Sequence, residues 1–135
     1  MLKLGLDWTP NVNHIGFFVA QAKGFYKSYG LELQISNPAD DDYALTPAKK
    51  IELGSLDFAL CPIESVISFR TKEKPFPLIA IAALLQEDLS AIAVRTNEGI
   101  NSPKDLDGKT YASYKARYED GIVKTMVAND RGKGN

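Results

Sequence analysis

Short apolar runs alternate with amphipathic segments along most of the chain. Apolar runs bounded by glycine, proline and polar residues are typical of buried strands, whereas apolar positions spaced three and four apart are typical of helices. Strands are predicted at residues 2–6, 31–35, 58–60, 78–84, 89–94 and 109–112. Helices are predicted at 14–22, 46–53, 63–69 and 118–128, with a short capped turn at 102–106. This alternation predicts an α/β fold with a mostly parallel sheet.

The predicted elements are divided unevenly along the chain. Residues 1–88 hold four strands with their helices, which is enough for most of one lobe, but residues 89–135 hold only two strands and one long helix. We therefore expect residues 1–88 to form lobe one, incomplete without a C-terminal return, and 89–135 to be the truncated beginning of lobe two. Two strands are too few for an independent lobe, so uncovered strand edges predict self-association of such a fragment.

Composition narrows the classes of function. The chain has 135 residues, 44% hydrophobic and 24% charged, with a formal net charge of −1, as is usual for a soluble globular protein. The balance of charges argues against nucleic-acid binding, and no apolar stretch reaches the roughly 20 residues that span a bilayer. A single cysteine, Cys61, excludes an intrachain disulfide and a cysteine-rich metal site. The absence of a signal-peptide pattern favours the cytoplasm, while a removed leader would leave a periplasmic or extracellular location open.

The loop after the first predicted strand carries the candidate chemistry. Residues 7–14 gather an indole (Trp8), two amides (Asn11 and Asn13) and the single histidine of the chain (His14). Ligands of open α/β sheets bind outside the carboxyl ends of the strands, where this loop is expected to lie. Trp8 could instead be a core residue, and Asn13 an ordinary helix N-cap. The clustering of these groups favours a clamp for a planar ligand.

Several segments match a known family. They are Asp7-Trp8-Thr9-Pro10-Asn11 with Asn13-His14, Ala22-Lys23-Gly24-Phe25-Tyr26, Tyr29-Gly30-Leu31, Gly54-Ser55-Leu56-Asp57-Phe58 and the stretch from Ile100 to Gly108. In these segments the chain resembles the thiamine-pyrimidine family, whose members share a two-lobed periplasmic-binding-protein fold of type II. That family includes transporter substrate-binding proteins for pyrimidine precursors of thiamine and fungal-type thiamine pyrimidine synthases. The resemblance implies binding of a pyrimidine precursor between two lobes, with an ABC-transporter permease as partner if the protein is exported.

The resemblance also implies roles for residues of lobe one. Trp8 would be the stacking wall for the pyrimidine, with Asn11 and His14 as polar contacts beside it. Glu64 matches an acidic position whose carboxylate can accept a hydrogen bond from an exocyclic amine. Glu64 could equally be an exposed first-turn glutamate that the helix dipole favours.

A second group of implied site residues lies between 111 and 119. The resemblance places Tyr114 opposite Trp8 and Glu119 near the ligand. Where family members often have a glycine-rich stretch, this chain has bulkier and more basic residues, including Lys115 and Arg117. Two cations before a helix N-terminus would suit a phosphate or carboxylate of the ligand, although they could also be solvated loop charges.

This chain departs from the family pattern at two positions that the synthases use. The synthases use pyridoxal phosphate with a lysine and a histidine just after the third strand, where this chain has Cys61 and Ser65. A thiol cannot form the imine that a lysine amine forms with the cofactor. We therefore expect a binding protein without a cofactor, catalytic residue or metal. A divergent synthase using pyridoxal phosphate and a metabolite-sensing module are the alternatives.

Overall fold

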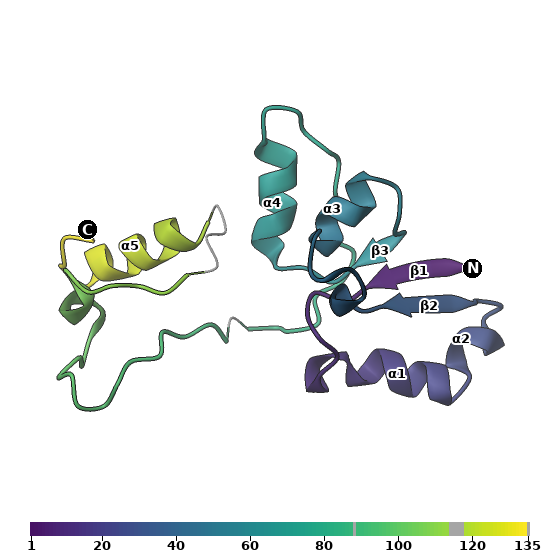
Figure 1. Ribbon diagram of the computed structural model, residues 1–135, viewed down its shortest axis with the longest axis horizontal. Coiled ribbons are helices and arrows are strands. Elements are labelled where there is room, and N and C mark those ends of the chain that lie inside the picture. The colour runs from purple at the N-terminus through teal and green to yellow at the C-terminus, as the bar shows by residue number, and fades with distance from the viewer. Residues whose placement is uncertain (88, 114–117, 135) are drawn as a thin grey trace. The chain divides into compact units, whose positions relative to one another are not determined.

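The chain forms two compact units. The computed structural model describes residues 1–87, 89–113 and 118–134, and the chain divides into Met1–Ala82 and Ala83–Asn135 (Figure 1). The assignment of the two parts to lobes stays a prediction. Among the residues that the structure describes, no helix is both long and apolar enough to cross a membrane.

A parallel sheet forms the centre of the first unit. Its strands are β1 (Leu2–Gly5), β2 (Leu33–Ser36) and β3 (Phe58–Ala59), in the order β2-β1-β3. In the middle strand, Leu4 pairs with Ile35 on one side and with Phe58 on the other. The three N-terminal strand predictions and the α/β class are therefore confirmed.

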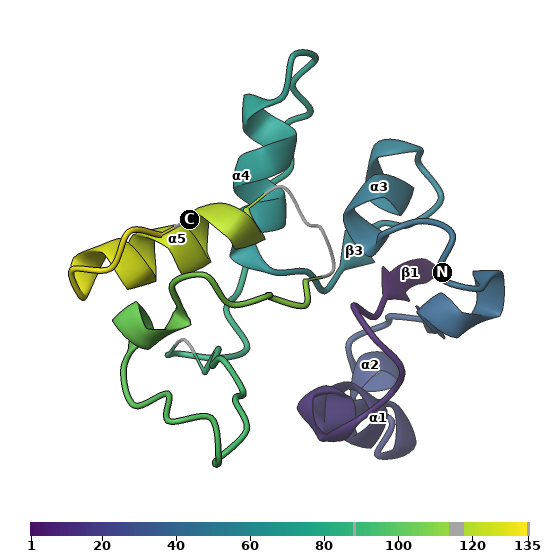
Figure 2. The same ribbon diagram turned by 60° about the vertical axis from the view of Figure 1, so that its left-hand side comes forward.

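Helices flank this sheet. Figures 1 and 2 both place α1 (Ile15–Ala22) and α2 (Phe25–Ser28) on one side of the sheet and α3 (Pro47–Glu52) on the other. The side chain of Thr46 accepts a hydrogen bond from the Lys49 N–H at 3.3 Å, and Pro47 occupies the first turn, where its missing N–H costs nothing. A fourth helix, α4 (Ile63–Thr71), follows β3. The bounds of α1, α3 and α4 agree with the predicted helices to within two residues, whereas α2 was not predicted as a helix.

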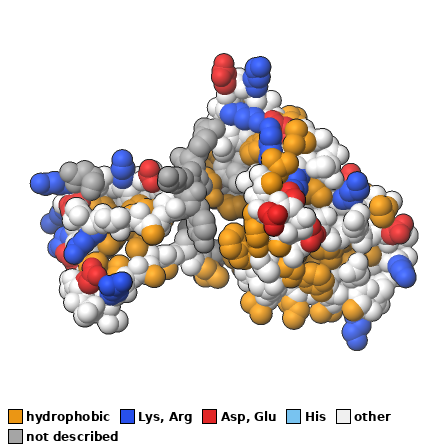
Figure 3. All heavy atoms as spheres, viewed as in Figure 1, with side chains coloured by type: hydrophobic (Ala, Val, Ile, Leu, Met, Phe, Trp, Pro, Cys, Tyr) orange, Lys and Arg blue, Asp and Glu red, His pale blue; other side chains and the backbone are white. Residues whose placement is uncertain are grey.

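The core of the first unit is small and centred on β1. Its buried apolar residues are Leu4, Leu6, Ala48, Leu56 and Leu78. Gly5 lets β1 and the segment before β3 approach closely, because a Cβ atom at this position would lie 2.4 Å from Cδ1 of Leu56. By contrast, hydrophobic side chains stay exposed over α1, on the face of the first unit seen in Figure 3.

The three later strand predictions are wrong. Residues 78–84, 89–94 and 109–112 are all described, and none of them is in a strand. Side chains in the first of these segments are largely solvent-exposed, 70% for Ile79 and 75% for Ile81. A strand requires a neighbour that pairs with its backbone N–H and C=O groups, and the described residues supply no such neighbour. An apolar run predicts the tendency of a segment to form a strand, but not that a partner is present.

Two segments of the second unit are helical among the residues that the structure describes. A 3-10 helix, η3 (Pro103–Leu106), begins with the reciprocal capping box of Ser102 and Asp105, as the sequence predicts. The long helix α5 (Glu119–Asn129) follows, close to its predicted bounds. The Asp107 carboxylate accepts hydrogen bonds from the backbone N–H groups of Lys133 (2.6 Å) and Gly134 (2.9 Å), which ties the segment after α5 to the end of η3.

Candidate functional site

The loops at the carboxyl edge of the sheet define the candidate site. Because β1, β2 and β3 are parallel, the loops that follow them start at the same edge. From β1 the chain crosses to β2 on one side of β1, and from β2 it crosses back to β3 on the other side. The gap between β1 and β3 is therefore the topological switch point of the sheet, where ligands of such sheets bind. Backbone hydrogen bonds extend the pairing to this edge, from Leu6 N–H to Ser36 O (3.0 Å) and from Leu60 N–H to Gly5 O (2.9 Å).

His14 holds the loop after β1 in shape. Its side chain is 2% exposed, and its Nδ1 accepts a hydrogen bond from the Asn11 backbone N–H at 3.1 Å. Since Nδ1 is an acceptor, the ring hydrogen of neutral His14 lies on Nε2, which donates to Asp7 Oδ1 at 2.8 Å. Both ring nitrogens are thus engaged within the loop. A direct contact between His14 and a ligand stays a prediction.

Asn11 caps the short helix that follows it. Its Oδ1 accepts from the Asn13 N–H at 2.9 Å at the start of η1 (Val12–His14), and its Nδ2 donates to Thr9 O at 2.9 Å. The alternative that Asn13 is an ordinary N-cap is wrong, because Asn13 lies inside η1 and Asn11 has the extended backbone that a cap needs. The Asn11 amide keeps one N–H beyond the bond to Thr9 with which it could contact a ligand.

Trp8 is one of a pair of aromatic residues at this edge. The indole is 51% exposed, which excludes the alternative that Trp8 is a core residue. Its ring centroid lies 5.2 Å from that of Tyr43, with the planes inclined by 43°. A hydrogen bond also joins the hydroxyls of Tyr43 and Thr9. Sequence reasoning missed Tyr43, although an aromatic residue ending a polar loop after the second strand was an available signal.

The loop after β3 places Cys61 and Glu64 on this same edge. Burial raises the pKa of the Cys61 thiol, and the negative charge of Asp7 raises this pKa further, so the two residues are electrostatic neighbours. The thiol is therefore protonated and a poor nucleophile at neutral pH. Glu64 is half-buried in the first turn of α4, and no side-chain hydrogen bond or ion pair links it to another described residue. Among the described residues, no three His, Cys, Asp or Glu side chains are grouped to hold a metal ion.

The predicted residues of the second unit are only partly described. Glu119 begins α5, and its carboxylate accepts a hydrogen bond from the Ser113 hydroxyl. The predicted contacts Tyr114, Lys115 and Arg117 lie outside the described residues.

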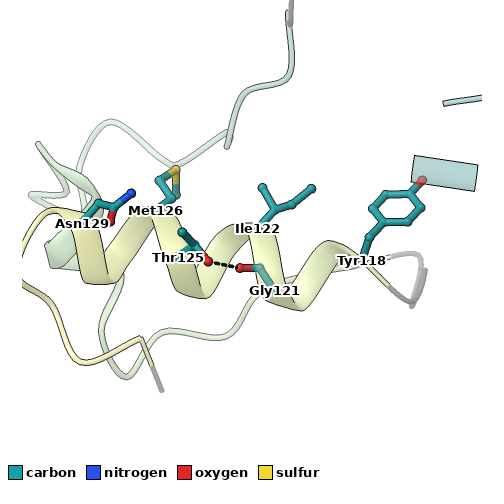
Figure 4. A pocket seen from close by; sticks show the side chains of 6 residues that line it. All are labelled: Tyr118, Gly121, Ile122, Thr125, Met126 and Asn129. Atoms are coloured by element: carbon teal, nitrogen blue, oxygen red, sulfur yellow. Dashed lines mark hydrogen bonds between the residues drawn. The ribbon is translucent and has the colours of Figure 1, made fainter. Parts of the chain in front are cut away.

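A hollow of about 650 Å³ runs along one face of α5 (Figure 4). It is lined by Tyr118, Gly121, Ile122, Thr125, Met126 and Asn129. The Thr125 hydroxyl donates to the Gly121 carbonyl at 2.7 Å, and none of the lining side chains is charged. The hollow therefore offers few groups that could orient a polar ligand, unlike the edge of the sheet in the first unit.

Comparison with known families identifies the chain. The family described as NMT1/THI5 like matches residues 11–135. This chain belongs to the NMT1/THI5-like family. Its predicted resemblance to the thiamine-pyrimidine family is thereby confirmed.

Three relatives show the range of this family. A putative thiamine biosynthesis protein of Haemophilus influenzae is 29% identical over 93% of the chain, and a formylaminopyrimidine-binding protein of Halalkalibacterium halodurans is 30% identical over 90% of it. A 4-amino-5-hydroxymethyl-2-methylpyrimidine phosphate synthase of Legionella pneumophila is 32% identical over 77% of the chain. The matched regions cover 38%, 36% and 31% of these relatives, so the NMT1/THI5-like chain spans only about a third of their length.

Proposed function

We propose that this NMT1/THI5-like chain binds a pyrimidine precursor of thiamine at the carboxyl edge of its parallel sheet. The half-exposed Trp8 indole carries the proposal, because it sits on the loop of the middle strand, beside the switch point of the sheet. The relationship to a formylaminopyrimidine-binding protein supports the class of ligand.

The side chains at this edge suit an aminopyrimidine. A flat heteroaromatic ring that stacks on an indole gains roughly 1–3 kcal/mol, judged from the stacking of nucleobases on aromatic side chains. The Glu64 carboxylate can accept a hydrogen bond from an exocyclic amino group, and such charge-assisted bonds are about twice as strong as neutral ones. The remaining N–H of Asn11 can donate to a ring nitrogen. Hydrogen bonds at the rim of the ring would supply the specificity that stacking lacks.

In the proposed whole protein, two lobes of the periplasmic-binding-protein type close around this ligand by a hinge motion. Glu119 and Tyr114 would then contact the ligand from the second lobe, and Lys115 and Arg117 would bind an acidic or phosphorylated substituent. A transporter permease is the proposed partner of an exported form.

Titration of the protein with 4-amino-5-hydroxymethyl-2-methylpyrimidine and with its formylamino analogue tests the proposal. Isothermal titration calorimetry should detect binding, and Trp8→Ala should weaken it about 5- to 150-fold, which corresponds to the loss of one stacking interaction. Phe25→Ala is the matched control, because Phe25 is an exposed aromatic residue of α2 in the same unit. Binding that Trp8→Ala and Phe25→Ala leave equally strong would contradict the proposed site, and absence of binding would contradict the proposed ligand.

A synthase that uses pyridoxal phosphate is the second candidate function, since several relatives are named as synthases. Pyridoxal phosphate does not fit the residues that follow β3. Its aldehyde needs an amine, whereas Cys61 offers a protonated thiol and Ser65 a hydroxyl. We expect calorimetric titration with pyridoxal phosphate to show no saturable one-to-one binding. Saturable one-to-one binding of pyridoxal phosphate would favour the synthase.

A further inference from the structure

Tyr43 contacts two consecutive residues of the loop after β1. Its ring lies against Trp8, with 5.2 Å between ring centroids, and its hydroxyl shares a hydrogen bond with Thr9. The two hydrogen-bonded residues are 34 positions apart in the sequence. Tyr43 therefore joins the loop after β2 to the loop that carries the proposed stacking wall.

The backbone around Tyr43 adopts a conformation that tyrosine rarely takes. Asp42 and Tyr43 have φ values of 51° and 58°, in the left-handed region that favours glycine. For residues with a side chain this region is energetically unfavourable. Two successive residues in this region indicate that the surrounding contacts hold the backbone there.

Several contacts hold this backbone in place. The Tyr43 N–H donates to Pro38 O at 3.0 Å, which closes the turn after η2 (Pro38–Asp41). At the start of η2, the Asn37 side chain accepts from the Ala39 N–H at 3.0 Å. The largely buried ammonium of Lys50, on α3, lies 2.9 Å from Asp41 Oδ2.

We propose that Tyr43 is a positioning residue that fixes the plane of the Trp8 indole before a ligand arrives. The two rings are inclined by 43° and both are about half-exposed, so Tyr43 supports the indole and leaves part of its surface open to a flat heterocycle. Holding a binding side chain in its bound orientation strengthens binding because less conformational entropy is lost. This inference rests on the proposed pyrimidine binding at Trp8 and adds the residue that sets the geometry of the site.

Trp8 is the single tryptophan of the chain, so its emission reports on this site without any ligand. Tyr43→Ala removes the ring and the hydroxyl, whereas Tyr43→Phe removes the hydroxyl alone and keeps the protein testable if the alanine variant does not fold. We expect Tyr43→Ala to increase acrylamide quenching of Trp8 and to change its near-ultraviolet circular dichroism, with a smaller change for Tyr43→Phe. Tyr29→Ala, at the highly exposed residue after α2, is the matched control and should leave both signals unchanged.

Calorimetric titration with 4-amino-5-hydroxymethyl-2-methylpyrimidine then measures the consequence for binding. Loss of an aromatic pair worth about 0.5–1.5 kcal/mol predicts a 2- to 12-fold weaker affinity for Tyr43→Ala than for Tyr29→Ala. Equal affinities of these two variants, with binding by the unmodified protein, would overturn the positioning role and leave the proposed function standing. If the unmodified protein binds no pyrimidine, the proposed function fails. Unchanged Trp8 quenching in both Tyr43 variants would overturn the positioning role whether or not a ligand binds.

Discussion

Replacing His14 with alanine should destabilise the first unit by about 3 kcal/mol. The substitution removes the hydrogen bond from Nε2 to the Asp7 carboxylate, and bonds to charged groups contribute about 1.5–3 kcal/mol. It also leaves the Asn11 N–H without the Nδ1 acceptor, for about 1 kcal/mol more. His14 itself is 2% exposed, so the substitution also removes its packing contacts, whereas the 44% exposed Asp7 carboxylate can bond to water instead.

Urea unfolding followed by Trp8 fluorescence measures this loss, because the indole lies on the loop that His14 supports. At an unfolding slope near 1–2 kcal/mol per molar urea, a loss of this size lowers the midpoint by about 1.5–3 M. Hydrogen exchange of the backbone amides from residue 9 to 14 should accelerate at the same time, since the loop loses both hydrogen bonds of the imidazole ring.

Two variants serve as controls. Val12→Ala, at a 79% exposed residue in the same loop, should change the free energy of unfolding by no more than about 0.5 kcal/mol. Asp7→Asn keeps an oxygen that accepts from His14 but removes the charge, so we expect an effect between those of Val12→Ala and His14→Ala. If His14→Ala destabilises the protein no more than Val12→Ala, the structural role assigned to the imidazole is refuted.

Two further predictions concern packing and pH. Gly5→Ala places a Cβ atom 2.4 Å from Cδ1 of the buried Leu56. This overpacking should lower the free energy of unfolding by about 1–3 kcal/mol, as measured by thermal or urea unfolding. A variant as stable as the unmodified protein would contradict the close approach. In the second unit, backbone N–H groups of residues 101 and 102 lower the pKa of Asp105, and the N–H of residue 104 lowers that of Asp130. Both carboxyl groups are more acidic in the folded state than in the unfolded state. They therefore stabilise the folded second unit fully at a pH above their ordinary pKa of 3.8, and this contribution is lost as the pH falls through their lower folded pKa values. Amide protection of η3 and α5 should therefore decrease as the pH falls below 3.8, and less so in an Asp105→Asn, Asp130→Asn double variant. Equal loss in both proteins would contradict this linkage.

Elements with local signals were predictable from the sequence. Thr46 before Pro47 marked the start of α3, and the spacing of Ser102 and Asp105 marked the capping box of η3. These signals depend on hydrogen bonds between residues two to four positions apart, so the sequence contains both partners. Burial was less predictable, because the apolar run at 78–84 has the same composition as a buried strand but largely exposed side chains.

The candidate site was predictable in its location and only partly in its contacts. Trp8 was expected at the carboxyl end of the first strand, and the parallel sheet placed it there. The proximity of Tyr43 to Trp8 depends on the pairing of β2 with β1 and on two residues with positive φ, and neither follows from local sequence. The hydrogen bonds of both His14 ring nitrogens were likewise not predictable, because a histidine in a polar loop can bond either to a ligand or to groups of the loop itself.

The sequence by itself therefore determined the family, the α/β class, the helix boundaries and the loop that carries the indole. Only the tertiary structure decided which apolar runs pair as strands, which aromatic residue lies beside Trp8 and how the single histidine is used. The physical reason is distance along the chain. Caps, turns and helices are stabilised within a few residues. Strand pairing and the Trp8–Tyr43 contact instead join segments 31 to 54 positions apart, whose meeting depends on the packing of everything between them.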